Sequence, residues 1–222
     1  DSSLLAILAA SLSQSVKYLL TVDFEESFKE SKIASQLASD LGIEHKVTTV
    51  RRKDFIDLLC EQIHIQDCPS GGLMNLGQHE NFKTAQNLGL KVILDGAGTD
   101  EAFGGYQSYH EKYLEHLDKT SSPNLSQEVE SFINFWGFTP TIQKNSHRIT
   151  QIDGSSDSIS RDQINDTFEE FRSKKIFSSK LLRGLRMKDR ASMANSIELR
   201  VPFVDSKVIG FGLSSPLRYL FK

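Results

Sequence analysis

Hydrophobic and polar positions follow two periods along roughly the first hundred residues of the chain. Apolar residues at helical spacing predict helices at 2–12, 30–41, 53–64 and 75–87, and short β-rich runs predict strands at 16–24, 45–50 and 91–94. Gly42 stands where the second helix is expected to end. Strands that alternate with helices imply right-handed crossovers, so the pattern predicts an α/β fold with a doubly wound, mostly parallel sheet.

The pattern after Glu101 is almost wholly helical. Helices are predicted at 111–117, 127–138, 161–176, 179–193 and 206–213, and the polar run 151–160 predicts a flexible loop. We therefore expect an α/β nucleotide-binding part, 1–106, followed by a helical layer, 107–222. Open parallel sheets bind ligands beyond the carboxyl ends of their strands, so the loops after Val22, Val50 and Leu94 are expected to face the site.

Composition and charge narrow the class of protein. Lys and Arg number 26 against 29 Asp and Glu, a net charge of −3, which argues against nucleic acid held by bulk charge. No run approaches the roughly 18 apolar residues of a membrane helix, and the apolar stretch 4–10 lacks the positive flank of a signal peptide. The sequence predicts neither a nucleic-acid nor a membrane partner.

The cysteines and histidines carry no metal-binding spacing. Cys60 and Cys68 form no C-x-x-C pair and read as thiols of a reducing compartment, which predicts a cytoplasmic location. Cys60 falls at an apolar helical position, so a packed core thiol is the favoured reading. The six histidines are scattered. An aromatic group at helical spacing is expected in the core: Phe132, Phe135, Trp136 and Phe138.

The strongest local pattern is DGAGTDEAFGGY at 95–106, directly after the predicted strand 91–94. Gly96 and Gly98 leave the backbone free to approach a ligand, and Asp100 and Glu101 place two carboxylates at the start of the next element. Glycines followed by acids suggest a metal-bound phosphate. An ordinary glycine-rich turn with an acidic helix start is an equally good reading of this pattern alone.

A second segment, RMKDRASMANSIELRVPFVD at 186–205, favours the first reading. With 95–106 it resembles the synthetase domain of glutamine-hydrolysing asparagine synthetases, where S-G-(D/E)-G-x-D-E-L-F-G-G-Y is followed by D-R-x-S-M-A-x-S-x-E-x-R-V-P-F-x-D. The resemblance covers essentially the whole chain. It implies a fold of the adenine nucleotide alpha hydrolase type and an ATP pyrophosphatase that forms an acyl-adenylate and transfers ammonia to a carboxylate, with ATP and Mg²⁺ as cofactors.

The resemblance also implies a phosphate and metal site. The family's phosphate loop reads S-G-G-x-D-S-S, and Asp1, Ser2 and Ser3 match its end. Asp1 and Asp100 match the acids that hold magnesium on the pyrophosphate of ATP, and Ser2 matches a donor to phosphate oxygen. Hard carboxylate oxygens suit Mg²⁺.

The resemblance implies roles for further residues of the site. Val22 and Gly96 resemble adenine and ribose contacts, and Asp95 stands in the same nucleotide-binding segment. Lys188 and Arg190 stand in a basic segment that resembles the one closing on the α-phosphate, with Arg190 the better match to the catalytic cation. The alternative reading of Lys188 and Arg190 is a solvated helix face.

The start of the chain suggests that the phosphate loop is cut through its middle. In the family a central strand precedes this loop, so we expect 1–222 to be an ATP pyrophosphatase domain without its first strand and half of the phosphate loop. The string at 70–73, SGGL, imitates the loop, but Met74 and Asn75 follow where Asp and Ser are required.

Two departures from the family pattern leave the acceptor open. Asp95 stands where Ser is usual, and Ala97 stands where an acid or amide normally meets the acceptor or the ammonia. Asparagine formation from aspartate is the reaction implied by resemblance. The alternatives are another acceptor, such as a surface-polysaccharide sugar precursor, and an inactive nucleotide-binding module.

The resemblance also concerns the source of ammonia. In the family, glutamine is hydrolysed by an N-terminal cysteine, and neither Cys60 nor Cys68 matches it. A glutaminase domain or subunit is therefore expected upstream.

Overall fold

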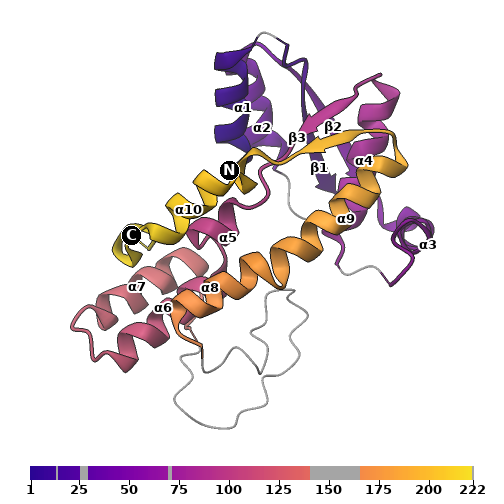
Figure 1. Ribbon diagram of the computed structural model, residues 1–222. Coiled ribbons are helices and arrows are strands. Elements are labelled where there is room, and N and C mark those ends of the chain that lie inside the picture. The colour runs from indigo at the N-terminus through magenta and orange to yellow at the C-terminus, as the bar shows by residue number, and fades with distance from the viewer. Residues whose placement is uncertain (14, 26–29, 70–71, 141–165, 222) are drawn as a thin grey trace. The chain divides into compact units, whose positions relative to one another are not determined.

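The computed structural model describes residues 1–13, 15–25, 30–69, 72–140 and 166–221 of the chain (Figure 1). These residues form a mixed α/β structure that is mostly helical and whose strands pair in parallel. The chain packs as two units, 1–97 with 183–202 and 98–182 with 203–222. The expected parts 1–106 and 107–222 stay a prediction about domains.

The first unit contains the four strands of the described chain. They are β1 (Tyr18–Phe24), β2 (Glu44–Val50), β3 (Val92–Leu94) and β4 (Glu198–Arg200). Its helices are α1 (Ser2–Leu12), α2 (Ser31–Leu41), α3 (Phe55–Gln66), α4 (Met74–Asn87) and most of α9 (Lys180–Ala194), with the 3-10 turn η1 (Arg52–Asp54) before α3. The elements predicted up to residue 94 are therefore present, with ends shifted by a few residues.

β1 and β2 form a parallel pair joined through α2. Their register runs from Tyr18 opposite Glu44 to Phe24 opposite Val50. α2 ends where the sequence predicts, because Gly42 adopts a left-handed conformation, φ 66°, that a glycine reaches without steric cost. This β-α-β unit is the local part of the fold that the sequence pattern anticipates.

β3 and β4 form a second parallel pair between segments about a hundred residues apart. Val92 lies opposite Glu198 and Leu94 opposite Arg200. The described part of the second half is almost wholly helical, as the sequence predicts, but the pattern did not anticipate β4. Its alternating burial spans three residues, too short a run for periodicity to single out, and the strand depends on its distant partner.

The described strands thus form two separate two-stranded sheets. The α/β class is confirmed, and the doubly wound sheet stays a prediction. Both pairs nevertheless share one core in the first unit. Phe82 and Ala85 of α4 and Ala191 of α9 are buried there, against Leu20 of β1, Ile93 of β3 and Leu199 of β4.

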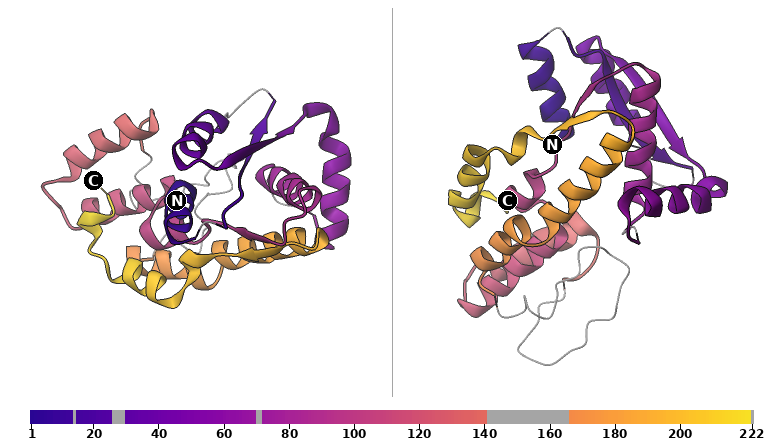
Figure 2. Two further views of the ribbon diagram at one scale, coloured as in Figure 1. Left: turned by 90° about the horizontal axis from the view of Figure 1, so that it is seen from above. Right: turned by 45° about the vertical axis from the view of Figure 1, so that its right-hand side comes forward.

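α4 lies closely against β1 and β2 (Figures 1 and 2). A Cβ placed on Gly77 would come within 2.6 Å of Val22 Cγ1, so the glycine allows the helix to approach the strand. The packing that holds α4 on the sheet also fixes the polar residues on either side of Gly77.

The second unit is helical. Its elements are α5 (Thr99–Phe103), α6 (Gln107–Lys119), α7 (Leu125–Trp136), α8 (Phe168–Phe177), α10 (Ser206–Ser214) and the 3-10 turn η4 (Leu217–Tyr219), while the turn η3 (Pro202–Val204) spans the boundary between the units. α8 begins at Phe168, and the predicted helical residues 161–165 lie outside the described residues, as do 151–160 and Ser70–Gly71. None of the described helices has both the length and the apolar character needed to cross a membrane.

Three core assignments made from helical spacing are wrong. Phe132 is fully buried as expected, but Phe138, which follows α7, is 44% exposed. Phe135 is 76% exposed because α7 buries the stripe that runs through Phe132 and Trp136. Cys60 is exposed, since α3 buries Leu58 and Gln62 and Cys60 lies midway between them on the opposite face. Short apolar runs define a helix better than they define which side of it is buried.

Candidate functional site

A charged pair lies at the carboxyl end of β3. The Asp95 N–H donates to Arg200 O at 2.9 Å, which extends the pairing with β4 by one residue. The Asp95 carboxylate then accepts, through Oδ1, the Lys188 ammonium at 2.6 Å and the Ala97 N–H at 2.8 Å. The side chains of Asp95 and Lys188 are 20% and 19% exposed, so the pair is largely screened from water but still accessible to a ligand.

A third donor completes this group. Gln78 Nε2 of α4 donates to Asp95 Oδ2 at 3.4 Å. We call Asp95, Lys188, Gln78 and the Ala97 N–H the Asp95 cluster. Sequence reasoning missed Gln78. Its polar side chain stands among the buried positions Gly77 and His79, and a polar residue in such a run is the signal that could have found it.

The glycine-rich turn touches the start of α1. A Cβ on Gly96 would lie 3.3 Å from both Asp1 Cβ and Ser2 N, closer than most side chains tolerate. The first backbone N–H groups of a helix have no intrahelical partner and carry partial positive charge. The structure therefore brings Asp1, Ser2 and Gly96 together, in surroundings whose donors fit an anionic group such as phosphate.

The second half of the same motif belongs to the second unit. Asp100 lies in α5, and its carbonyl accepts the N–H groups of Gly104 and Gly105 at 2.9 and 3.0 Å. Gly98 has φ 98°, and a Cβ there would lie 2.8 Å from Val204 Cγ2. Asp1 and Asp100 fall in different units. Their shared magnesium site stays a prediction, and carboxylate oxygens are the ligands such an ion prefers.

Arg190 is engaged at the end of α3. Its Nε donates to Ile65 O at 2.9 Å and its guanidinium pairs with Asp67, which ends the helix in a left-handed conformation. A cation there offsets the negative end of the helix. The structure thus joins Lys188 to Asp95 and Arg190 to α3, and the roles of both at an α-phosphate stay predictions. Val22 packs against Gly77, and its adenine contact also stays a prediction.

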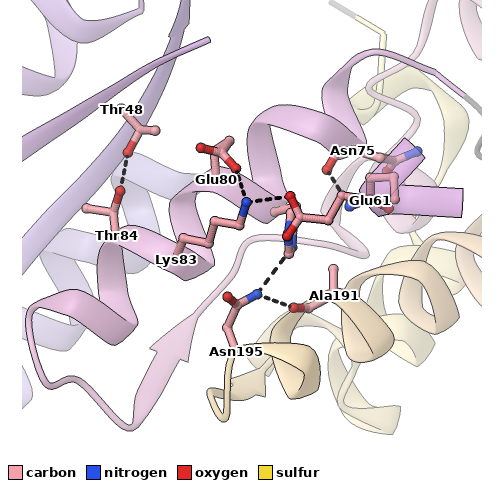
Figure 3. A network of polar contacts seen from close by, with 10 residues as sticks. Thr48, Glu61, Asn75, Glu80, Lys83, Thr84, Ala191 and Asn195 are labelled. Atoms are coloured by element: carbon pink, nitrogen blue, oxygen red, sulfur yellow. Dashed lines mark hydrogen bonds and ion pairs between the residues drawn. The ribbon is translucent and has the colours of Figure 1, made fainter. Parts of the chain in front are cut away.

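A second polar group, which we call the His79 network, contains Glu61, His79, Glu80, Lys83 and Asn195 (Figure 3). Lys83 Nζ lies 2.5 Å from Glu61 Oε2 and 2.9 Å from Glu80 Oε1. His79 is 1% exposed, and its Nε2 faces Glu61 Oε1 at 3.1 Å. Ligand atoms of Glu61, His79 and Glu80 lie within 4.8 Å of one another, a spacing that a metal ion could use.

The contacts of His79 argue against a metal there. Asn195 Nδ2 donates to Ala191 O at 2.8 Å and also lies 3.2 Å from His79 Nδ1. An amide nitrogen has no lone pair to offer, so Nδ1 must accept and the ring hydrogen sits on Nε2, where a metal would need a lone pair. Lys83 already supplies the cation between the two carboxylates. We therefore interpret the network as a structural group held mainly by ion pairs.

The charged groups of this network shift one another's pKa values. Burial alone would raise the pKa of Glu61, but the hydrogen bonds from Lys83 and His79 outweigh it and lower that pKa. For Lys83, burial would lower the pKa, and the Glu61 and Glu80 carboxylates raise it instead. Both shifts favour the ion pairs at neutral pH.

A glycine-rich turn at the carboxyl end of a parallel strand, beside a helix N-terminus, is the arrangement by which α/β proteins bind phosphate groups. The sequence model of the family described as Asparagine synthase matches residues 1–222. The chain belongs to that family.

Individual relatives agree at low identity. The chain is 24% identical, over 99% of its length, to a protein of Methanocaldococcus jannaschii provisionally named glutamine-hydrolysing asparagine synthetase 1, of which it covers 31%. It is 26% identical to glutamine-hydrolysing asparagine synthetase 1 of Bacillus subtilis, over 97% of the chain and 39% of that protein. A provisionally named asparagine synthetase of Mycobacterium tuberculosis is 26% identical over 89% of the chain and 35% of its own length. The chain therefore spans about a third of the curated relatives it matches.

Proposed function

We propose that the chain is the ATP-using part of a carbon–nitrogen ligase that converts a carboxylate into an amide. Membership of the asparagine synthase family supports an ATP-dependent ligase or amidotransferase. The observation that carries the proposal is the Asp95 cluster at the end of β3, next to Gly96 and the start of α1.

The proposed reaction has two steps. An acceptor carboxylate oxygen attacks the α-phosphorus of ATP, the bond to the β-phosphate oxygen breaks, and pyrophosphate leaves to give an acyl-adenylate. Ammonia then attacks the acyl carbon, AMP leaves, and one proton is released as the amide forms. Negative charge grows on the phosphates in the first step, so a fixed cation such as the Lys188 ammonium would stabilise its transition state.

Each residue of the site is assigned a role by its chemistry. The α1 start with Ser2 would donate to phosphate oxygens, and Gly96 leaves room for the ligand beside the strand end. Asp1 and Asp100 would hold Mg²⁺, which neutralises charge on the leaving pyrophosphate when bound. Arg190 could assist only by leaving or sharing its place at the end of α3, which makes Lys188 the favoured cation.

The doubly wound sheet belongs to this proposal. Both parallel pairs pack on the same core of α4 and α9, which suits two halves of one sheet. The strand expected before the phosphate loop would pair between β1 and β3 and join the halves. Backbone groups on those strand edges would then find partners, as buried groups require.

The donor of nitrogen and the surroundings are also proposals. The names of the relatives refer to glutamine hydrolysis, and a glutaminase domain or subunit of the longer protein would supply ammonia to this chain. ATP and reduced thiols are both found in the cytoplasm, which is the location we propose.

A different acceptor is the second candidate, and one observation favours it. The methyl group of Ala97 can neither accept a proton nor hydrogen-bond an amino group, and its backbone N–H is already bound to Asp95. Aspartate is the default acceptor by resemblance, and another carboxylate, such as that of a surface-polysaccharide sugar, would not require an acid at this position.

The deciding experiment uses the full-length protein. AMP and pyrophosphate release is measured with a panel of carboxylates and either ammonia or glutamine. Equal amounts of AMP, pyrophosphate and amide support the proposal and identify the acceptor. ADP and phosphate as products, or no turnover with any acceptor, would contradict it, the latter pointing to an inactive nucleotide-binding module.

A further inference from the structure

Asp95 is held by donors from three separate parts of the first unit. Its Oδ1 accepts from Lys188 on α9 at 2.6 Å and from the Ala97 N–H in the glycine-rich turn at 2.8 Å. Its Oδ2 accepts from Gln78 on α4 at 3.4 Å. One carboxylate therefore ties a helix, a turn and a second helix to the end of β3.

Such a carboxylate is badly placed to bind a nucleotide directly. Phosphate groups are anions and repel a carboxylate. Oδ1 of Asp95 already accepts hydrogen bonds from Lys188 and from the Ala97 N–H. A magnesium ion would have to displace or share those donors. The same arrangement suits a different task, since Lys188 has a flexible four-carbon stem that loses rotamer freedom when its ammonium is fixed.

We propose that Asp95 is a positioning residue: with the help of Gln78, it holds the Lys188 ammonium at the carboxyl end of β3, beside Gly96 and the start of α1. The inference rests on the proposed function, because it assigns Lys188 to the phosphate groups of that reaction. Lys188 has three ammonium hydrogens, and within the described part of the chain its recorded partner is Asp95. Two hydrogens remain to donate to a ligand.

Gln78 matters because it fixes the carboxylate plane. The Ala97 N–H and Lys188 both approach Oδ1, so without a contact on Oδ2 the group could rotate about χ2, a broad torsion for Asp. The Gln78 amide limits that rotation from the α4 side. Gln78 is itself held in place because α4 packs tightly on β1 at Gly77.

The rival reading is that Asp95 only neutralises Lys188. The two readings predict opposite results for an anionic ligand. If Asp95 positions the ammonium, its removal lowers anion affinity although it also removes a negative charge. If Asp95 merely neutralises, its removal frees positive charge and raises affinity.

The test measures binding of inorganic pyrophosphate to the full-length protein by calorimetry, with and without Mg²⁺. The variants are Asp95→Asn, Lys188→Met and the double variant. We expect Lys188→Met to lower affinity about tenfold, as loss of one charge-assisted hydrogen bond does. Asp95→Asn should lower it several-fold in both conditions, and the double variant should bind no worse than Lys188→Met, since the two residues act as one unit.

The matched control is another lysine–carboxylate pair of the first unit. Lys46 and Glu44 lie 2.5 Å apart on the exposed part of β2, and Lys46→Met, Glu44→Gln and their double variant should leave pyrophosphate affinity unchanged. Gln78→Met is the second test variant, which keeps the volume and loses the donor. It should lower affinity about two- to threefold, as expected for one long hydrogen bond from a neutral donor.

Each outcome decides something. Affinity that is unchanged or higher in Asp95→Asn overturns the positioning role, and an effect of Asp95→Asn seen only with Mg²⁺ overturns it in favour of a metal ligand. Should Asp95→Asn fail to fold, wild-type affinity in Gln78→Met overturns it. Wild-type protein that binds no pyrophosphate refutes the proposed function and this inference together, whereas wild-type binding with an unaffected Asp95→Asn refutes this inference alone.

Discussion

The Asp95 cluster and the His79 network lie in the same unit, and both link α4 through polar side chains to α9 or to Asn195, which directly follows α9. They differ in which polar groups they leave available to a ligand. In the His79 network each carboxylate shares the Lys83 ammonium, and both ring nitrogens of His79 face a partner. In the Asp95 cluster the Lys188 ammonium, as far as the described residues go, keeps hydrogens to donate to a ligand. It also lies at a strand end beside Gly96.

The difference shows that residue types alone do not identify a site. A histidine with two glutamates has the composition of a metal centre. The side-chain amide of Asn195, however, places the ring hydrogen of His79 on Nε2, so that this nitrogen has no lone pair for a metal. A lysine–aspartate pair has the composition of an ordinary salt bridge. Its place at the carboxyl end of a parallel strand makes it the better candidate for ligand chemistry.

The largest expected effect comes from removing the cation of the Asp95 cluster. In Lys188→Met the rate of pyrophosphate release by the full-length protein should fall about 100-fold or more, because donors to developing phosphate charge act mainly in the transition state. The ATP concentration at half-maximal rate should change much less. Both values are measured by steady-state kinetics, with Lys46→Met as the control. Wild-type kinetics in Lys188→Met would leave Lys188 only a structural ion-pair partner of Asp95.

The His79 network should respond in stability instead. His79→Ala removes a buried ring and takes one of their two partners from Asn195 and Glu61, which keep Ala191 O and Lys83, so the free energy of unfolding should fall by about 2–4 kcal/mol. Denaturant titration measures this loss, and the ATP concentration at half-maximal rate should not change. His64→Ala, an exposed position on α3, is the control and should stay within about 0.5 kcal/mol. A stable His79→Ala protein without activity would reverse the comparison.

Adding an acid beside the Asp95 cluster should change the acceptor. We expect weak or no asparagine formation from aspartate by the wild-type protein, and about a tenfold gain in Ala97→Glu, near the low end of general acid–base effects. The matched control is Ala97→Gln, which has the same shape and cannot take up a proton. The asparagine formed by the wild type and by each variant is measured by mass spectrometry. Efficient wild-type conversion with no gain from glutamate would refute a role for position 97 in acceptor choice.

The smallest effect is a pH dependence confined to the His79 network. The pKa of folded Glu61 is lowered from its ordinary value of 4.5, so its ionised form adds stability above that pH, and this contribution is lost as pH falls through the folded pKa. The difference in unfolding free energy between wild type and Glu61→Gln, under about 1 kcal/mol for this partly exposed group, should shrink as pH falls from 7 to 3. In a Lys83→Met background it should be smaller at pH 7. A constant difference across this range would contradict the assignment.

Several features of the fold could be predicted because they depend on neighbours in sequence. The β1–α2–β2 unit follows from local periodicity, and Gly42 ends α2 because a left-handed residue is required there. The glycine-rich motif was recognisable as a candidate ligand turn, since glycine spacing is itself a sequence property. Family membership follows from the same motifs.

Other features depended on contacts between distant segments. β4 exists through its pairing with β3, and Gln78 reaches Asp95 because Gly77 lets α4 approach β1. Sequence favoured Arg190 over Lys188 as the site cation, and the structure shows Arg190 bound at the end of α3 and Lys188 joined to Asp95.

The sequence alone determined which local elements form and to which family the motifs point, because turn chemistry and periodicity act over a few residues. Only the tertiary structure decided which charged groups meet, which face of α3 or α7 is buried, and which ring nitrogen of His79 carries the hydrogen. Those properties depend on packing across the unit, where a single neighbouring amide or glycine determines whether a polar side chain is satisfied or left available for chemistry.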